Sequence, residues 1–142
     1  MSVFHSNNVN ETVSLGKEIG AKIKDGTVIA YFGSMGMGKT AFTHGLAEGM
    51  GIDPQQVSSP TFAIVHEYTG NGRKLCHFDM YRIETWDDLY STGFFDYLES
   101  NAVLAVEWSE NIENALPENY IRIIFSGCEN ENERNIEIIG EL

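Results

Sequence analysis

Gly33-Ser34-Met35-Gly36-Met37-Gly38-Lys39-Thr40 is the stretch that decides the fold. It fits G-x-x-x-x-G-K-[ST], the phosphate-binding loop of nucleotide hydrolases and kinases. Glycines let the backbone curl so that successive N–H groups point at phosphate oxygens, and the helix that follows adds its positive N-terminal dipole. Lys39 reaches the β- and γ-phosphates, and the Thr40 hydroxyl is offered to Mg²⁺. The motif therefore predicts a nucleotide site.

The residues around this loop are those that such a site needs. Residues 27–32 form a short run of apolar, β-branched and aromatic side chains, which predicts a buried strand. After the loop, apolar residues recur at helical spacing until Gly51: Phe42, Leu46, Ala47 and Met50. A strand, a glycine-rich loop and a helix in this order favour a phosphate loop over a turn that binds nothing.

Composition indicates an ordinary globular protein. The chain has 142 residues, 42% of them apolar, which suits one domain spanning residues 1–142. No apolar run approaches the roughly 18 residues of a membrane span, and the first ten residues lack a signal pattern. Cys76 and Cys128 have no paired spacing, so we expect buried, reduced thiols and a cytoplasmic protein.

The net charge of −12 is distributed unevenly. Residues 1–83 carry seven acidic and seven basic side chains, whereas residues 84–142 carry fourteen acids against Arg122 and Arg134. Such a surface repels a polyanion, so independent nucleic-acid binding is disfavoured. The acidic half is either a solvated face or a docking surface for a partner protein.

The first helix and a hairpin also have local signals. Asn8 with Glu11 three residues later predicts an N-cap, followed by a buried stripe of Leu15, Ile19 and Ile23 that ends at Asp25-Gly26. On this pattern alone Thr12 is a surface residue of the first turn. Runs 62–68 and 75–81 flank Asn71-Gly72, a two-residue turn that places His66 opposite His77. A metal site there would need a third ligand, and Cys76 points to the other face.

The second half predicts two short helices and three strands. A helix begins at Thr85, Gly93 breaks it, and a second helix covers 94–99. Residues 102–106 form a buried strand that ends at Glu107. An acid at such a strand end, beside a phosphate loop, is placed to hold Mg²⁺, the alternative being an acid in solvent. Strands at 120–125 and 135–139 are expected to form an edge appendage.

Five motifs taken together resemble the TsaE family, the small bacterial ATPase of tRNA threonylcarbamoyladenosine biosynthesis. They are T-x-x-L-G (12–16), the phosphate loop, S-P-T-F (59–62), H-F-D-M-Y-R (77–82) and V-E-W (106–108). Their order and spacing cover nearly the whole chain. The resemblance implies a P-loop NTPase-like α/β fold, with a mixed, mostly parallel sheet flanked by helices and antiparallel hairpins.

The resemblance also implies an activity and partners. ATP would be bound and hydrolysed with Mg²⁺, and TsaB and TsaD would transfer the threonylcarbamoyl group to the adenosine next to the anticodon, so tRNA is reached only through them. By motif, Lys39 and Asp79 are catalytic, Thr40 and Glu107 hold the metal, and 59–61 form a nucleotide-sensing loop. The nucleotide-binding set is Thr12, Gly33, Ser34, Met35, Gly36, Met37, Gly38, Lys39, Thr40, Ala41 and Trp108.

Two positions depart from the family's pattern. Ser34 stands where an acid is common, and Ala41 stands where a second hydroxyl is common, which leaves only its backbone N–H for the α-phosphate.

Three other activities fit a phosphate loop. A small-molecule kinase must hold two anionic substrates, and arginine is the residue suited to that task. The chain has only four arginines, which disfavours a kinase. A non-catalytic nucleotide sensor would carry the same residues. A GTPase is disfavoured because no N-K-x-D segment is present. For an ATPase with so few arginines we expect slow hydrolysis alone and stimulation by partners.

Overall fold

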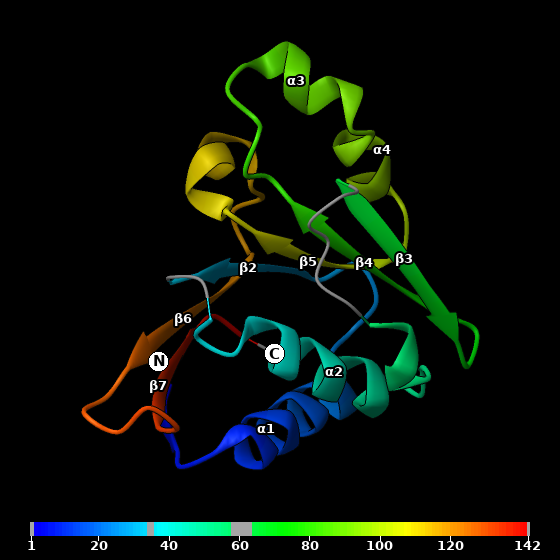
Figure 1. Cartoon of the computed structure of the whole chain (residues 1–142). Helices are drawn as coiled ribbons and strands as arrows, with labels where there is room; N and C mark the ends of the chain where they lie inside the picture. Colours follow the sequence, from blue (N-terminus) through cyan, green and yellow to red (C-terminus); the bar gives the residue numbers. More distant parts are fainter. Residues whose placement is uncertain (1, 34–35, 58–63, 142) are drawn as a thin grey trace.

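The computed structural model describes residues 2–33, 36–57 and 64–141. These form one seven-stranded sheet in the order β1-β7-β6-β2-β5-β4-β3, with helices on both faces (Figure 1). The elements are β1 (Ser2–Ser6), α1 (Val9–Lys22), β2 (Val28–Phe32), α2 (Lys39–Gly49), η1 (Pro54–Gln56), β3 (Val65–Gly70), β4 (Arg73–Asp79), α3 (Trp86–Ser91), α4 (Phe94–Glu99), β5 (Val103–Glu107), η2 (Ser109–Ala115), β6 (Ile121–Gly127) and β7 (Arg134–Ile139).

The centre of the sheet is parallel. Strand β2 pairs in parallel with β5 and β6, and β5 pairs in parallel with β4. Antiparallel pairs flank this centre, β3 with β4 on one side and β1, β7 and β6 on the other. The predicted mixed α/β sheet with antiparallel hairpins is confirmed. The four parallel strands bring their carboxyl ends to one edge, where open α/β sheets bind ligands.

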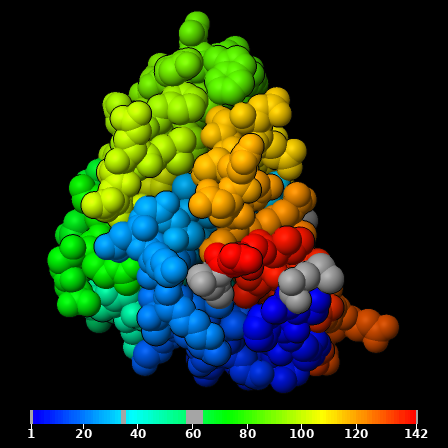
Figure 2. Space-filling view, turned by 180° about the vertical axis from the view of Figure 1, so that it is seen from behind, coloured from blue at the N-terminus to red at the C-terminus, as the bar shows by residue number. Residues whose placement is uncertain are grey.

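Each face of the sheet is covered by its own helices. Helices α1 and α2 lie on one face, and α3, α4 and η2 lie on the other (Figure 1). Strand β2 is buried on both faces, with Ile29 and Tyr31 in the core beneath α1 and α2 and Val28 in the second core. In the view from behind, residues around 24–28 lie beside the red C-terminal segment (Figure 2). No helix among the described residues is long and apolar enough to cross a membrane.

The helix caps and the hairpin turn predicted from local sequence are confirmed. The Asn8 side chain accepts a hydrogen bond from the Glu11 N–H at 3.0 Å, so α1 starts where the capping pattern placed it. Thr85 and Asp88 form a capping box at α3. In the β3–β4 hairpin, His66 lies opposite His77 as expected, although residues 62 and 63 of the predicted first strand fall outside the described residues.

Glycines allow α1 and α2 to touch through their backbones. A Cβ added at Gly16 would lie 2.2 Å from the Phe42 carbonyl oxygen, and one at Gly45 would lie 2.0 Å from the Val13 oxygen. Both distances are far below van der Waals contact, so only hydrogen fits there. The neighbouring glycines one turn along each helix, Gly20 and Gly49, are crowded in the same way. This contact places α1 directly against the helix that begins at the phosphate loop.

Two expectations, about the last strands and the cysteines, were wrong, and one strand was not predicted. Strand β6 is no edge appendage, since it pairs with β2 inside the sheet and buries Ile121 and Ile123 beneath the helices. The edge is β1, a strand too short and polar to predict, which pairs with β7. Cys76 is fully buried, but Cys128 is only half-buried because it follows β6 at the end of the sheet.

Candidate nucleotide-binding site

The phosphate loop joins the carboxyl end of β2 to the N-terminus of α2. Its first glycine, Gly33, has a φ of 126°, and a Cβ there would lie 2.3 Å from the Phe125 carbonyl oxygen. Gly38 has a φ of 102° and is the N-cap of α2. Glycine is required at both positions because other residues avoid this backbone region. Ser34 and Met35 lie outside the described residues.

Lys39 is held close to the loop. The residue is only 8% exposed, and its Nζ donates a hydrogen bond to the Gly33 carbonyl at 2.5 Å. The backbone of this first turn is anchored to β2, because Thr43 Oγ1 donates to the Lys39 carbonyl at 2.8 Å and lies 2.8 Å from the Tyr31 hydroxyl. Thr40 and Ala41 follow on the same turn, both half-buried. The cation therefore faces the loop and the helix N-terminus together.

Thr12 is buried beside the phosphate loop and does not lie on the surface. It is 2% exposed, and its Oγ1 lies 2.7 Å from Ser6 Oγ. Its methyl group would be 3.5 Å from a Cβ on Gly38, so the first turn of α1 adjoins the phosphate loop. The helix pattern alone predicted Thr12 to be a surface residue. That prediction is wrong, because β1 and the phosphate loop, which are not part of α1, cover Thr12.

Asp79 and Glu107 stand side by side at the ends of β4 and β5. The two residues are paired in the parallel ladder, and both are half-buried. Burial raises the pKa of Asp79 and the nearby Glu107 raises it further, while the Tyr81 N–H, His77 and Lys39 oppose the rise. Asp79 Oδ1 accepts that N–H at 2.9 Å. Two carboxylates and the lysine thus share one edge of the sheet.

His77 adjoins the two acids, a contact that the sequence analysis did not predict. It is fully buried, and its Nε2 lies 2.5 Å from Glu107 Oε2. The available signal was its position two residues before Asp79, which puts both side chains on one face of β4. The metal hypothesis for the histidine pair fails, because His66 and His77 both face the Tyr68 hydroxyl, at 3.4 and 3.5 Å, and join no third ligand within the described ranges.

Trp108 follows Glu107 directly and is the N-cap of η2. Its backbone is left-handed, with a φ of 59°, and its ring lies 4.9 Å from the Tyr81 ring. Asn111 braces this corner by donating to the Met80 carbonyl at 2.8 Å. The indole therefore borders the edge where Asp79 and Glu107 end, while the motif segment 59–61 lies outside the described residues.

The oxygen donors at this edge have the chemistry that magnesium requires. Mg²⁺ binds hard oxygen ligands and is usually held by one or two carboxylates together with substrate phosphates. Glu107 and Asp79 supply carboxylates, and Thr40 supplies a hydroxyl at the start of α2. Burial is the main cause of the raised pKa of Asp79, and repulsion from Glu107 adds to it; a divalent cation would offset that repulsion.

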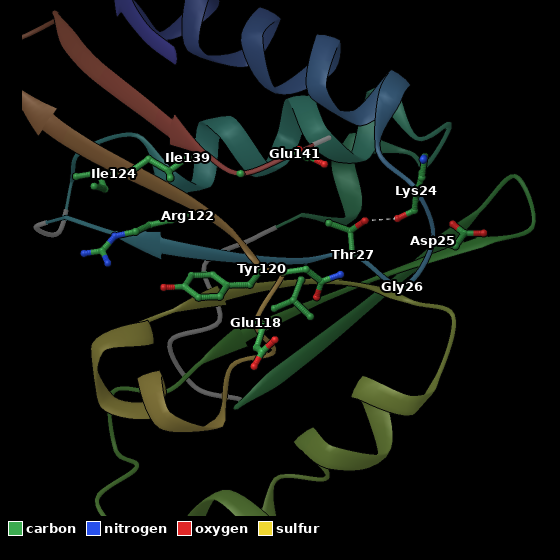
Figure 3. Close-up of a pocket in the computed structure, with 13 residues that line it drawn as sticks. Lys24, Asp25, Gly26, Thr27, Glu118, Tyr120, Arg122, Ile124, Ile139 and Glu141 are labelled. Atoms are coloured by element: carbon green, nitrogen blue, oxygen red, sulfur yellow. Dashed lines mark hydrogen bonds between the residues drawn. The ribbon is translucent and has the colours of Figure 1, made fainter. Parts of the chain in front are cut away.

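The groove in Figure 3 is separate from this site. It has a volume of about 1050 Å³ and is lined by the residues that enter β2 and β6 and leave β7, so it lies towards the opposite edge of the sheet. The Arg122 guanidinium lies 4.2 Å above the Phe32 ring. The acids Asp25, Glu118 and Glu141 share this groove, which disfavours a nucleotide there.

Comparison with known proteins gives one consistent family. The family model described as "Threonylcarbamoyl adenosine biosynthesis protein TsaE" matches residues 6–136. A TsaE protein of Bacillus subtilis is 39% identical over 129 residues, 91% of this chain and 79% of that protein. A TsaE protein of Treponema pallidum is 32% identical over 118 residues, 83% of this chain and 86% of that protein.

A solved structure agrees with the sequence relatives. The crystal structure of Bacillus subtilis YdiB superposes with a TM-score of 0.77 and 31% identity, covering 95% of this chain and 82% of that one. This chain belongs to the TsaE family.

Proposed function

We propose that this protein binds and hydrolyses ATP with Mg²⁺ as part of the machinery that makes threonylcarbamoyladenosine in tRNA. The observation that carries the proposal is the meeting of Lys39 and the Asp79–Glu107 pair at one edge of the sheet. A phosphate grip and neighbouring acids are the parts that a P-loop hydrolase needs. Family membership adds the biosynthetic context, since the relatives are named as tRNA threonylcarbamoyladenosine biosynthesis proteins.

The loop and its neighbours bind the nucleotide in this proposal. Lys39 contacts the β- and γ-phosphates, and backbone N–H groups of the loop cradle the others. Thr12 contacts the nucleotide at its base end, supported by its position beside Gly38. Trp108 packs near the site. The full set is Thr12, Gly33, Ser34, Met35, Gly36, Met37, Gly38, Lys39, Thr40, Ala41 and Trp108.

The residues at the ends of β4 and β5, together with Thr40, have the remaining roles in this proposal. Thr40 and Glu107 would hold Mg²⁺, which when bound neutralises charge on the phosphate oxygens. His77 positions Glu107, because a buried imidazole at 2.5 Å restricts where that carboxylate can turn. Asp79 acts at the γ-phosphate by orienting the attacking water. Its raised pKa suits a carboxylate that also accepts a proton.

Partner proteins complete the proposal. TsaB and TsaD are the partners, and tRNA is reached only through them, because the acidic chain repels a polyanion by itself. The arginine nearest the acids in sequence, Arg82, is exposed, so transition-state charge is poorly compensated in the isolated protein. Turnover alone should be slow, on the order of 10⁻⁴ to 10⁻² per second, as in P-loop proteins without an added arginine.

Replacing Lys39 with alanine tests the proposal. Nucleotide affinity and phosphate release would be measured for wild type and Lys39→Ala, each alone and with TsaB–TsaD, and a panel of small-molecule phosphoacceptors would be screened in parallel. We expect weaker ATP binding, no hydrolysis by the variant and unchanged folding by circular dichroism. Wild-type turnover in folded Lys39→Ala would disprove the assigned role. Phosphorylation of an acceptor instead of water would replace the ATPase by a kinase.

A further inference from the structure

His5, Cys128 and Glu133 come together at the end of the sheet formed by β1, β6 and β7. His5 lies on β1, Cys128 directly follows β6, and Glu133 directly precedes β7. Their ligand atoms all lie within 4.8 Å of one another. We propose that these three side chains bind a divalent transition-metal ion of the zinc class. This site shares no residue with the proposed nucleotide site and does not depend on ATP hydrolysis.

The hydrogen bonds of His5 support a cation between the side chains. His5 Nδ1 lies 3.0 Å from Asn135 Oδ1, and Nε2 lies 3.1 Å from Glu133 Oε2. Both neighbouring atoms are hydrogen-bond acceptors. If a neutral imidazole donates from Nδ1 to Asn135, the lone pair of Nε2 points at the Glu133 carboxylate. That arrangement needs either a proton or a metal ion at Nε2. Metal-bound histidines ordinarily donate their other N–H to such an acceptor, which is the place that Asn135 holds.

The ligand types select the metal. A thiolate, an imidazole and a carboxylate suit Zn²⁺ and its neighbours, whereas Mg²⁺ prefers oxygen alone. Three protein ligands leave a fourth tetrahedral position for water. Cys128 is half-buried, so solvent ions reach it, while Cys76 is fully buried in the core and cannot substitute. Binding requires the Cys128 thiolate and therefore releases its proton.

Strand pairing brings the three segments together and places them near the phosphate loop. Arg134 pairs with Ser6 of β1 on one side and with Gly127 of β6 on the other. Its guanidinium Nη2 donates to the Gly36 carbonyl at 3.3 Å. An ion at this cluster would tie the exposed edge strand to the β6–β7 turn, because it joins residues from all three strand ends.

Cobalt binding by the full-length reduced protein tests the site directly. Co²⁺ would be titrated with excess Mg²⁺ present, which occupies oxygen-only sites, and the thiolate-to-cobalt charge-transfer band would be recorded. We expect the band in wild type and in Glu131→Gln, a matched acid of the same turn outside the cluster. Cys128→Ser should abolish the band, and His5→Gln should weaken Zn²⁺ binding at least about tenfold.

A second set of measurements separates ligands from the positioning residue. Asn135→Ala should weaken Zn²⁺ binding by about 10- to 100-fold, while Asn135→Asp, which keeps an acceptor, should retain wild-type affinity or better. Zn²⁺ should raise the thermal midpoint of wild type but not of Cys128→Ser. If wild type gives no thiolate band, or if Cys128→Ser binds Zn²⁺ as tightly as wild type, the proposed site does not exist.

Discussion

Replacing Gly45 with alanine should destabilise this protein by about 2 kcal/mol, although alanine is ordinarily the better helix residue. Gly45 lies in α2, where an added Cβ would be 2.0 Å from the Val13 carbonyl oxygen and 2.8 Å from the Lys17 nitrogen of α1. Both atoms belong to the backbone, so no side-chain rotation relieves the contact. The two helices would have to separate locally by roughly 1.4 Å to restore ordinary contact.

Two opposing effects decide the magnitude. Alanine gains about 1 kcal/mol over glycine in a helix interior. Overpacking costs about 1–3 kcal/mol, and a clash between two backbones belongs at or above the upper end of that range. The net loss of about 2 kcal/mol should lower the thermal midpoint by roughly 4–8 °C in a chain of this size. Gly45→Ala would increase stability only if the backbones of α1 and α2 were not in contact.

Urea unfolding at pH 7 measures this effect. The midpoint should fall by about 1 M with an unchanged m value. The control is Ser14→Ala, at an exposed position of α1, which should stay within about 0.5 kcal/mol of wild type or gain slightly. If Gly45→Ala is as stable as wild type or more so, the close contact between α1 and α2 is refuted, and with it the reason why Thr12 lies at the phosphate loop.

Three further predictions concern the acids and thiols. Asp79→Ala and Glu107→Ala should lose more than about threefold in turnover while ATP affinity changes less, and a variant within threefold of the wild-type rate would exclude that residue from the chemistry. Because burial and Glu107 raise the pKa of Asp79, the folded state holds that proton more tightly than the unfolded chain, so wild-type stability falls as pH rises above 3.8 through the raised value. Asp79→Asn cannot ionise and therefore lacks this loss of stability. Its free energy of unfolding minus that of wild type should increase between about pH 4 and 7. If that difference stays constant with pH, burial and Glu107 are not the cause of the raised pKa. Burial raises the pKa of Cys76 to about 12, so a thiol reagent should modify Cys128 alone in the native protein and both cysteines in urea, and two fast-reacting native thiols would show that Cys76 is not sealed in the core.

Much of the fold could be predicted because its signals are local. The strand and helix that flank the phosphate loop, the Asn8 cap and the Asn71-Gly72 turn each have a signal in a few adjacent residues, and each forms where the pattern placed it. Glu107 was placed at a strand end by the buried run before it. Such features depend on backbone geometry over one turn, so distant parts of the chain do not alter them.

The parts that could not be predicted depend on contacts between distant residues. Thr12 has the pattern of a surface position, but it packs against Ser6 of β1 and lies beside Gly38, both distant in sequence. His77 meets Glu107 across thirty residues of sequence, through a register that periodicity does not specify. Strand β6 was predicted as a strand but given the wrong place, since the alternation of its side chains fits an interior strand as well as an edge.

The acidic half of the chain adjoins the phosphate loop instead of lying away from it. A Cβ on Gly127 would lie 3.5 Å from the sulfur of Met37, and Arg134, at the end of the acidic turn, donates to Gly36. The ends of β6 and β7 that flank the acidic turn, and the acids at the ends of β4 and β5, therefore lie beside a loop whose one lysine is Lys39. Such a field opposes an approaching triphosphate, and the opposition weakens when a divalent cation arrives with it. On the proposed function, magnesium thus matters for admitting the nucleotide as well as for the transition state. A partner that adds positive charge at this edge would raise both affinity and turnover.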